Sequence, residues 1–201
     1  DVINYSISGG TDPYNDPIAQ AFLAANDAGI FVAASAGNSG PGAGTVNHQA
    51  PWVTTVAATT HDRLLSNRLS QLTSSAGSLA AIVGQSVTGG YGPAPIVYAG
   101  DYGDALCLQA FPDDTFQGEI VVCDRGQIAR VDKGLHVLSG GAGGLVLANT
   151  DAAQTVNSDV HYLPAVHISA ADAADLKTWL ATGSGHHGVI SGTTVANDSS
   201  A

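Results

Sequence analysis

The chain has 201 residues, enough for one substantial hydrophobic core or two small ones, which excludes both a disulfide-only miniprotein and a large multidomain assembly. Six basic residues against 17 acidic residues give a formal net charge of −11, so phosphate backbones and anionic membrane surfaces would repel the chain. We therefore expect neither nucleic acid nor membrane as a partner. Because 44% of the residues are hydrophobic and only 11% are charged, the composition is typical of a folded domain.

The chain begins with the pattern of a strand followed by a helix. Residues 2–7 are rich in β-branched and aromatic side chains and predict a strand. Asp16 followed by Pro17 is typical of a helix start, with an acidic cap and proline at the first helical position. Apolar residues then repeat at helical spacing over residues 18–25, and Gly29 is a natural C-terminal cap.

Two further strands complete an alternating unit in the first 60 residues. Residues 30–36 are almost all apolar, as expected for a strand covered on both faces, and residues 53–58 predict another strand. A strand–helix–strand crossover places its strands in one parallel sheet, where functional groups gather in the loops at the carboxyl ends. The loops after Ile7 and Ala36 are therefore the candidates for a functional site.

The composition changes after the first unit. Residues 64–92 are rich in Ser, Leu, Gly and Gln without a clear helical or strand period, which indicates a boundary. Helices are predicted over residues 128–138 and from a capping box at Ser169 through Leu180, and the residues from Asn197 onward are typical of a tail. The strands expected in this half are residues 96–98, 119–123, 144–148, 165–168 and 188–191.

Residues 36–41, Ala-Gly-Asn-Ser-Gly-Pro, are the first segment with recognisable chemistry. Glycines permit sharp backbone turns, and an Asn amide held at the end of a buried strand can donate to developing negative charge without itself titrating. Taken alone, the same letters more often form only a turn. The surrounding sequence is therefore needed to decide between the two interpretations.

That context consists of three blocks in a fixed order. Residues 2–10 read Val-Ile-Asn-Tyr-Ser-Ile-Ser-Gly-Gly, residues 31–41 end in the segment just described, and residues 45–63 contain His-Gln-Ala-Pro-Trp-Val-Thr-Thr-Val-Ala-Ala. Together they closely resemble the middle of the catalytic domain of subtilisin-like serine proteases (subtilases). The resemblance implies that Asn38 is the oxyanion-hole asparagine, whose amide donates to the oxyanion of the tetrahedral intermediate.

The same resemblance implies which residues contact the substrate. Ser6, Ile7 and Ser8 would form the edge segment that pairs with the substrate backbone as an added strand. Ala36 and Gly37 would form a wall of the primary specificity pocket. The family usually has glycine where Ser8 stands, so a side chain at this position would narrow or reshape that pocket.

The catalytic triad of the family is missing from this sequence. The Asp-Thr-Gly, His-Gly-Thr-His and Gly-Thr-Ser-Met-Ala blocks that carry the Asp, the His and the nucleophilic Ser do not occur among the 201 residues. In the family, the first two precede the matching segment and the third follows it. We therefore expect the chain to be a piece of a secreted serine endopeptidase that is inactive by itself.

The second half has a resemblance of its own. Residues 116–126, 140–149 and 163–168 resemble the protease-associated (PA) domain, a non-catalytic module inserted between the oxyanion-hole and nucleophile segments of many secreted subtilases. The expected fold is α/β, with a partial parallel-sheet subtilisin-like segment followed by a β-rich α/β PA domain. The expected division is a partial catalytic domain at residues 1–63, a PA domain at residues 64–195 and a returning tail at residues 196–201.

The two cysteines, Cys107 and Cys123, allow one internal disulfide, and the alternative is a pair of buried thiols. The resemblance to PA domains favours the disulfide, because in that family the cysteine equivalent to Cys123 often pairs with one shortly upstream. A bridge between residues about 15 apart would stabilise the fold by roughly 3 kcal/mol.

We expect no cofactor and no metal site. The glycines of residues 140–144 follow a predicted helix and precede a predicted strand, the reverse of a dinucleotide-binding loop, and the histidine spacing completes no zinc site. Asp12, Asn15 and Asp16 could bind Ca²⁺, a cation that many subtilases hold in the full-length protein. A turn and a helix cap account for these three residues without an ion.

Two alternatives to a working protease stay open. The chain could be a stand-alone, non-catalytic PA-type protein-binding module, or the PA domain could hold two copies together as a homodimer. The intact run around Asn38 favours the protease, because a relic would have no need of that donor. The partners expected for a protease are protein or peptide substrates.

Overall fold

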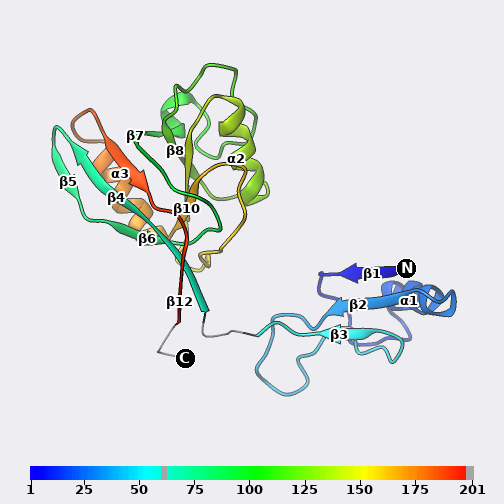
Figure 1. The fold of residues 1–201 in the computed structure, drawn as a ribbon. Helices are drawn as coiled ribbons and strands as arrows, with labels where there is room; N and C mark the ends of the chain where they lie inside the picture. Colours follow the sequence, from blue (N-terminus) through cyan, green and yellow to red (C-terminus); the bar gives the residue numbers. More distant parts are fainter. Residues whose placement is uncertain (60–62, 198–201) are drawn as a thin grey trace. The chain divides into compact units, whose positions relative to one another are not determined.

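The computed structural model describes residues 1–59 and 63–197, and it divides the chain into two compact units. Unit 1 is Asp1–His61 and unit 2 is Asp62–Ala201, whereas the sequence placed the division after residue 63. The fold is α/β, with a short parallel sheet in unit 1 and a mixed sheet with helices in unit 2 (Figure 1). No helix among the described residues is both long and apolar enough to cross a membrane.

The described part of unit 1, residues 1–59, consists of three parallel strands and one helix. The strands lie in the order β1 (Val2–Tyr5), β2 (Phe31–Ser35) and β3 (Thr54–Val56), and α1 (Pro17–Asp27) connects β1 to β2. The side chain of Asp16 accepts a hydrogen bond of 3.0 Å from the backbone nitrogen of Ile18, and Pro17 is the first helical residue. The predicted crossover, its helix cap and its parallel pairing are therefore confirmed.

The sheet of unit 1 is covered on one face. Phe22 of α1 forms a small core with Val32 and Ala34 of β2. Successive residues of a strand point to opposite faces, and on the other face Phe31 is 52% exposed. Within the described residues, the expectation of a strand covered on both faces is therefore met on one face only.

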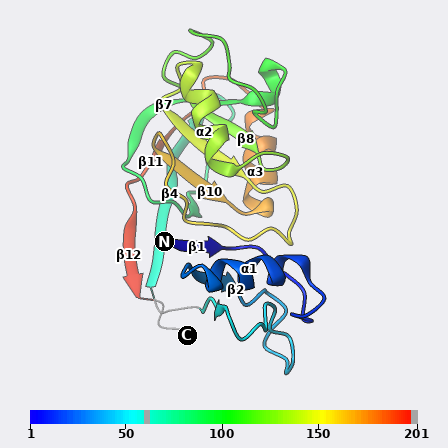
Figure 2. The same cartoon turned by 90° about the vertical axis from the view of Figure 1, so that its right-hand side faces the viewer.

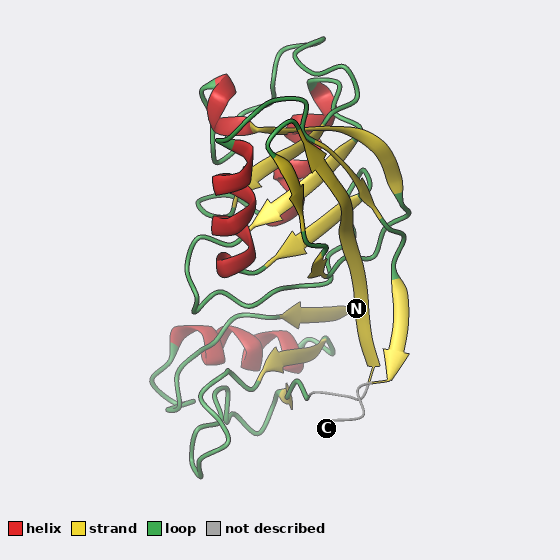
Figure 3. Cartoon of the chain, turned by 90° about the vertical axis from the view of Figure 1, so that its left-hand side faces the viewer, coloured by secondary structure: helices red, strands yellow, loops and turns green. Residues whose placement is uncertain are grey.

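Unit 2 is built on a nine-stranded sheet (Figures 1 and 3). Its main path runs β10-β9-β8-β7-β11-β4-β12, and two short strands, β5 and β6, pair with β4. The four strands from β10 to β7 are parallel, and the remaining pairs are antiparallel. The strand bounds are β4 (Arg63–Ser74), β5 (Gly77–Leu79), β6 (Ile82–Gly84), β7 (Tyr91–Tyr98), β8 (Ile120–Asp124), β9 (Gly144–Ala148), β10 (Ala165–Ile168), β11 (His187–Ile190) and β12 (Thr194–Asn197).

Two helices cover opposite faces of the parallel strands (Figure 2). Leu176 of α3 (Ala170–Leu180) belongs to the same core cluster as Val122 of β8. Val137 of α2 (Arg130–Ser139) belongs to the cluster of Val121, the neighbouring residue in β8. Because adjacent residues of a strand face opposite ways, the near-continuous apolar runs of these strands are explained by burial from both sides. A 3-10 turn, η1 (Ala99–Tyr102), follows β7.

The long strand β4 corrects the expectation that residues 64–92 lack regular structure. Leu69 and Leu72 are both buried, although a spacing of three breaks the period of a strand. The cause is a bulge: Gln71 has a φ of +53°, and the partners of His187 and Val189 are Thr73 and Ser70. The bulge thus shifts the alternation of buried and exposed residues, so that the sequence does not show the regular period of a strand.

The first and last described residues of unit 2 lie side by side. β12 pairs antiparallel with the first residues of β4, so that Arg63 is opposite Asn197. The tail expected at residues 196–201 therefore starts inside β12, and residues 198–201 lie outside the described residues. The chain enters and leaves the unit at neighbouring positions, which is the geometry that an inserted domain requires.

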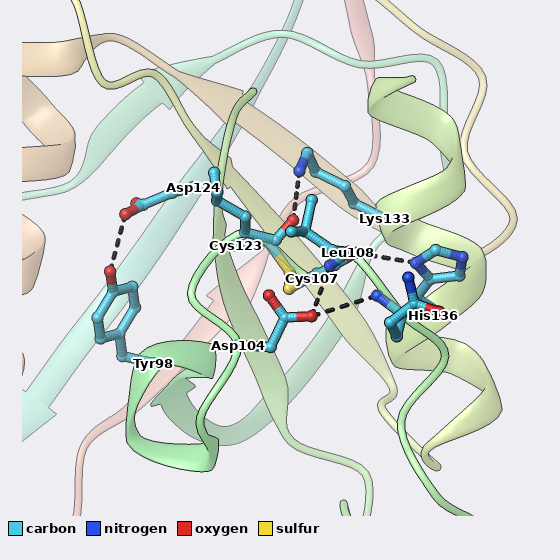
Figure 4. The surroundings of a disulfide bond; sticks show 10 residues. Tyr98, Asp104, Cys107, Leu108, Cys123, Asp124, Lys133 and His136 are labelled. Atoms are coloured by element: carbon cyan, nitrogen blue, oxygen red, sulfur yellow. Dashed lines mark hydrogen bonds between the residues drawn. A yellow bond between two sulfur atoms is a disulfide. The ribbon is translucent and has the colours of Figure 1, made fainter. Parts of the chain in front are cut away.

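A disulfide joins Cys107 to Cys123 in unit 2, and both cysteines are fully buried (Figure 4). Two residues one turn apart on α2 bind the backbone beside it. Lys133 donates from Nζ to the carbonyl oxygen of Leu106, and Nδ1 of His136 lies 2.8 Å from the carbonyl oxygen of Cys107. Burial lowers the pKa of the Lys133 ammonium. These contacts fasten the upstream half of the disulfide loop to the helix.

Replacing both cysteines with serine should lower the free energy of unfolding by about 3 kcal/mol, because a loop of about 15 residues is then no longer closed in the unfolded chain. Urea denaturation of the full chain, followed by the fluorescence of the buried Trp179 in a Trp52→Phe background, measures the change. Cys107→Ser alone should lose as much as the double variant, since either one removes the same bond. An unchanged midpoint and slope would contradict the prediction.

Candidate functional site

The carboxyl ends of the three strands of unit 1 surround an open hollow of about 510 Å³. β1 and its end contribute residues 4 and 6, β2 and its end contribute residues 33–38, and β3 and its end contribute residues 56–58. The three strands are parallel, so their carboxyl ends meet at one edge of the sheet, where α/β folds place their ligands.

Asn38 lines this hollow just beyond the end of β2. Its side chain is exposed and makes no hydrogen bond within the described parts of the chain. The turn that presents it depends on Gly37, which has a φ of +80° and whose missing Cβ would lie 2.1 Å from Oδ1 of Asn47. The backbone nitrogen of Asn47 donates to the carbonyl oxygen of Ala36 at 3.0 Å. Glycine adopts this positive φ without strain, whereas a larger residue would be strained there and would displace the side chain of Asn47.

The residues expected to contact substrate are partly gathered at the hollow. Ser6, Ala36 and Gly37 line it together with Asn38, whereas Ile7 and Ser8 lie next along the chain and are exposed outside the lining. The hydroxyl oxygen of Ser6 accepts a hydrogen bond of 3.2 Å from the side chain of Asn4. The structure thus brings four of these six residues to one place, and their roles stay predictions.

Several residues of the site were not singled out from the sequence. Ala57 and Ala58 line the hollow, and the rule that parallel strands end at one edge would have found them from the strand at residues 53–58. Asn47 and His48 lie beneath the loops, with Nε2 of the buried His48 2.9 Å from the carbonyl oxygen of Ile7. No local pattern marks these two residues, because their contacts are made by distant parts of the chain.

The residues considered for Ca²⁺ are engaged in a turn and a cap. The carboxylate of Asp12 accepts hydrogen bonds from the backbone nitrogen of Tyr14 at 3.1 Å and from the side chain of Asn15 at 2.7 Å, which lower the pKa of Asp12. Asp16 caps α1. In residues 1–59 and 63–197, no three side chains of His, Cys, Asp or Glu are grouped so that they could hold a metal ion.

In unit 2, the corresponding edge is occupied by a hydrogen-bonded network. Arg125, after β8, donates to the side-chain oxygen of Asn149, after β9, at 3.2 Å and to the carbonyl oxygen of Thr155 at 2.7 Å. Nε2 of His167 lies 2.7 Å from the same Asn149 oxygen, and Nδ1 accepts from the backbone nitrogen of Asn157 at 3.0 Å. His167 is fully buried, and burial lowers its pKa to about 4.

A second buried histidine lies in the segment that leads to β10. His161 is 7% exposed, and neither of its ring nitrogens has a hydrogen-bond partner among the described residues. Burial lowers the pKa of His161, while the nearby carboxylate of Asp159 opposes this effect. Asp159 is itself paired with Arg130 at 2.9 Å between Oδ1 and Nη2. Burial therefore favours the neutral form of both His161 and His167 in the folded unit.

Comparisons with known proteins match both units. Residues 92–176 match the model of the PA domain. Three relatives come from Arabidopsis thaliana. Subtilisin-like protease SBT1.5 is 39% identical over 198 residues, which cover 92% of this chain and 25% of that protein. Subtilisin-like protease SBT1.6 is 37% identical, and the match covers 89% of this chain and 24% of that protein. Subtilisin-like protease SBT1.4 is 35% identical, and the match covers 90% of this chain and 24% of that protein. The chain thus spans about a quarter of the length of these relatives.

Lowering the pH from 7.5 to 5 should destabilise unit 2. The folded pKa values of His161 and His167 lie below their ordinary value, so the unfolded chain binds protons first. The stabilisation is complete above about pH 6.5 and is lost as the pH falls toward the folded pKa of His167, about 4, with a slope on the order of 1 kcal/mol per pH unit for this histidine. His161 adds to the loss in the same direction. Urea denaturation at several pH values measures the slope, which His167→Gln should reduce and exposed His187→Gln should not. Equal stability at pH 7.5 and 5 would refute the prediction.

Proposed function

Because this chain belongs to the subtilisin-like proteases and carries a PA domain, we propose that it is part of a secreted serine endopeptidase. In this proposal, unit 1 supplies the oxyanion donor and the substrate-binding edge, and unit 2 is a non-catalytic binding module. The serine, histidine and aspartate of the triad come from sequence outside these 201 residues, so the chain by itself does not hydrolyse peptides.

The observation that carries the proposal is the free amide of Asn38 at the hollow. Acyl transfer to a serine passes through a tetrahedral intermediate whose oxygen is negatively charged, and a donor held in place for that oxygen stabilises the transition state. The Asn38 amide is neutral at all working pH values, is held at a strand end by the tight turn at Gly37, and has no competing partner among the described residues. These properties are the ones such a donor needs.

The substrate would pair with residues 6–8, the segment that follows β1. An extended peptide would add to this segment through main-chain hydrogen bonds, as a strand adds to the edge of a sheet. Residues 6–8 continue β1 past the hollow, whose walls at Ala33, Ala36 and Ala58 carry small side chains. This leaves space for one side chain of a peptide or protein substrate.

Unit 2 is proposed as the recognition module. Its first strand, β4, pairs with its last strand, β12, so the chain enters and leaves the unit at neighbouring points. Such a unit can be inserted between two segments of another domain while those segments stay close together. At the ends of its parallel strands, Arg125 and His167 both bind Asn149 and so bind one another through it. Sedimentation of the chain at two salt concentrations tests whether this unit also forms a homodimer.

The buried disulfide supports secretion. Disulfides form and persist in oxidising compartments, and reducing cytosolic conditions keep most thiols free. Cys107 and Cys123 are the only cysteines in the sequence, and the structure joins them.

In the longer protease, Asn38→Ala should lower kcat by about 10²–10³, the loss known for the equivalent donor in subtilisin itself, with little change in KM. Steady-state kinetics on a peptide substrate measures both constants, and Asn26→Ala on the exposed surface of α1 is the matched control. Wild-type kcat in the Asn38→Ala variant would refute the role of Asn38. A longer protein without any peptidase activity would refute the proposed function.

A further inference from the structure

His48 is the most deeply buried polar side chain beneath the candidate site, with 1% of its surface exposed. Its Nε2 lies 2.9 Å from the carbonyl oxygen of Ile7. A carbonyl oxygen only accepts, so Nε2 carries the proton and donates it. Nδ1 is buried without a hydrogen-bond partner among the described residues, so the bond to Ile7 is the one polar contact of this ring there.

The backbone of the same segment joins all three strand ends of unit 1. The nitrogen of His48 donates to the carbonyl oxygen of Gly10 at 3.2 Å, in the loop that follows β1. The carbonyl oxygen of His48 accepts from the hydroxyl of Thr55 in β3 at 2.6 Å. One residue earlier, Asn47 donates to the carbonyl oxygen of Ala36, after β2. Residues 47 and 48 therefore connect the loops around the hollow to the sheet.

The imidazole is fixed by the groups packed around it. The rings of Tyr5 and Phe22 contact it at centroid distances of 5.5 and 6.0 Å. On the side of the loop, a Cβ at Gly9 would lie 2.0 Å from Cε1 of His48, so the backbone at Gly9 passes directly against the ring. Any larger residue at position 9 would push the loop and the ring apart.

His48 also adopts a backbone conformation that is uncommon for residues other than glycine, although histidine, asparagine and aspartate adopt it more often than the rest. Its φ is +50°, in the left-handed region, where asparagine is among the residues best tolerated after glycine. Such a conformation persists only when the surroundings impose it, and it is concentrated at functional sites. The contacts with Gly10, Thr55 and Ile7 supply that constraint here.

We propose that His48 is a positioning residue that holds residues 6–8 in the conformation that binds the substrate backbone. This inference rests on the proposed function. The bond from His48 fixes the carbonyl of Ile7 inside the unit and so sets the course of the chain at Ser6 and Ser8 on either side. A segment that is already ordered binds a peptide without a further loss of conformational entropy.

The kinetic consequence is a change in KM and not in kcat. Without the bond, the substrate itself has to order residues 6–8, which weakens binding equally in the ground state and in the transition state. Loss of such uniform binding raises KM and leaves kcat unchanged. The effect should grow with the length of substrate that pairs with residues 6–8, and a short substrate that does not reach them should be little affected.

Two amide substitutions separate the hydrogen bond from the rest of the side chain. In His48→Gln, the amide nitrogen stands at the same number of bonds from the backbone as Nε2 and can donate to Ile7. In His48→Asn, the amide reaches only the position of Nδ1, which has no partner, while asparagine tolerates the left-handed backbone. In the longer protease, His48→Asn should raise KM for an extended peptide roughly fivefold, and His48→Gln should stay within about twofold of wild type.

Thermal unfolding of both variants confirms that they fold, and His187→Asn, on the surface of unit 2, is the control for a histidine replaced elsewhere. If His48→Asn does not fold, Gly9→Ala is tested instead. A Cβ at position 9 would collide with the His48 ring and displace the same loop while leaving His48 in place. Three results would overturn the inference. The first is equal KM values in wild type and His48→Asn, and the second is an equal increase in KM in the His48→Gln and His48→Asn variants. The third is a KM increase as large for a short substrate as for an extended one. A longer protein without peptidase activity would instead refute the proposed function, and a protease that loses kcat in Asn38→Ala but keeps KM in His48→Asn would refute this inference alone.

Discussion

Parallel strand pairing is the constraint on which both units depend, because it brings the carboxyl ends of neighbouring strands to one edge of a sheet. In unit 1, three such ends surround a hollow, and the amide of Asn38 stands there without a partner among the described residues. In unit 2, the side chains beyond β8 and β9 bind each other, since Arg125 and His167 both contact Asn149. Among the described residues, the same edge is thus open in unit 1 and occupied by side chains that bind one another in unit 2.

Much of the fold follows from local signals in the sequence. The caps at Asp16 and Ser169 mark the starts of α1 and α3, because each side chain bonds to the backbone two or three residues later. Strand β4 is not predicted from the local sequence, for two reasons. The bulge at Gln71 shifts the alternation of buried residues, and the buried Asn67 looks like a surface residue although it donates to the carbonyl oxygen of Ala165 at 2.6 Å. Long-range contacts of this kind leave no local pattern.

The residues of the candidate site likewise differ in whether local or long-range contacts define them. Asn38 could be found from the sequence because the glycine turn and the strand that present it are its immediate neighbours. His48 could not, since its partner Ile7 is 41 residues away and its ring is enclosed by parts of β1 and α1. Lys133 is a similar case in unit 2: a lysine is expected on the surface, yet this one is fully buried and bound to a backbone carbonyl beside the disulfide. Sequence patterns thus show the exposed groups that line the candidate site more readily than the buried groups that bind the backbone.

The pairing of β4 with β12 also decides how unit 2 responds to tension. A force applied to the chain on both sides of the unit acts at Arg63 and Asn197, which face each other at the end of an antiparallel ladder. The force then breaks the hydrogen-bonded pairs between β4 and β12 one after another, starting at Arg63 and Asn197. In a shear geometry, all pairs would carry the force together. The disulfide lies outside this ladder, between β8 and the loop after η1, so it does not prevent the opening. Stretching would therefore peel β12 away first and leave the covalently closed part of the unit folded until later.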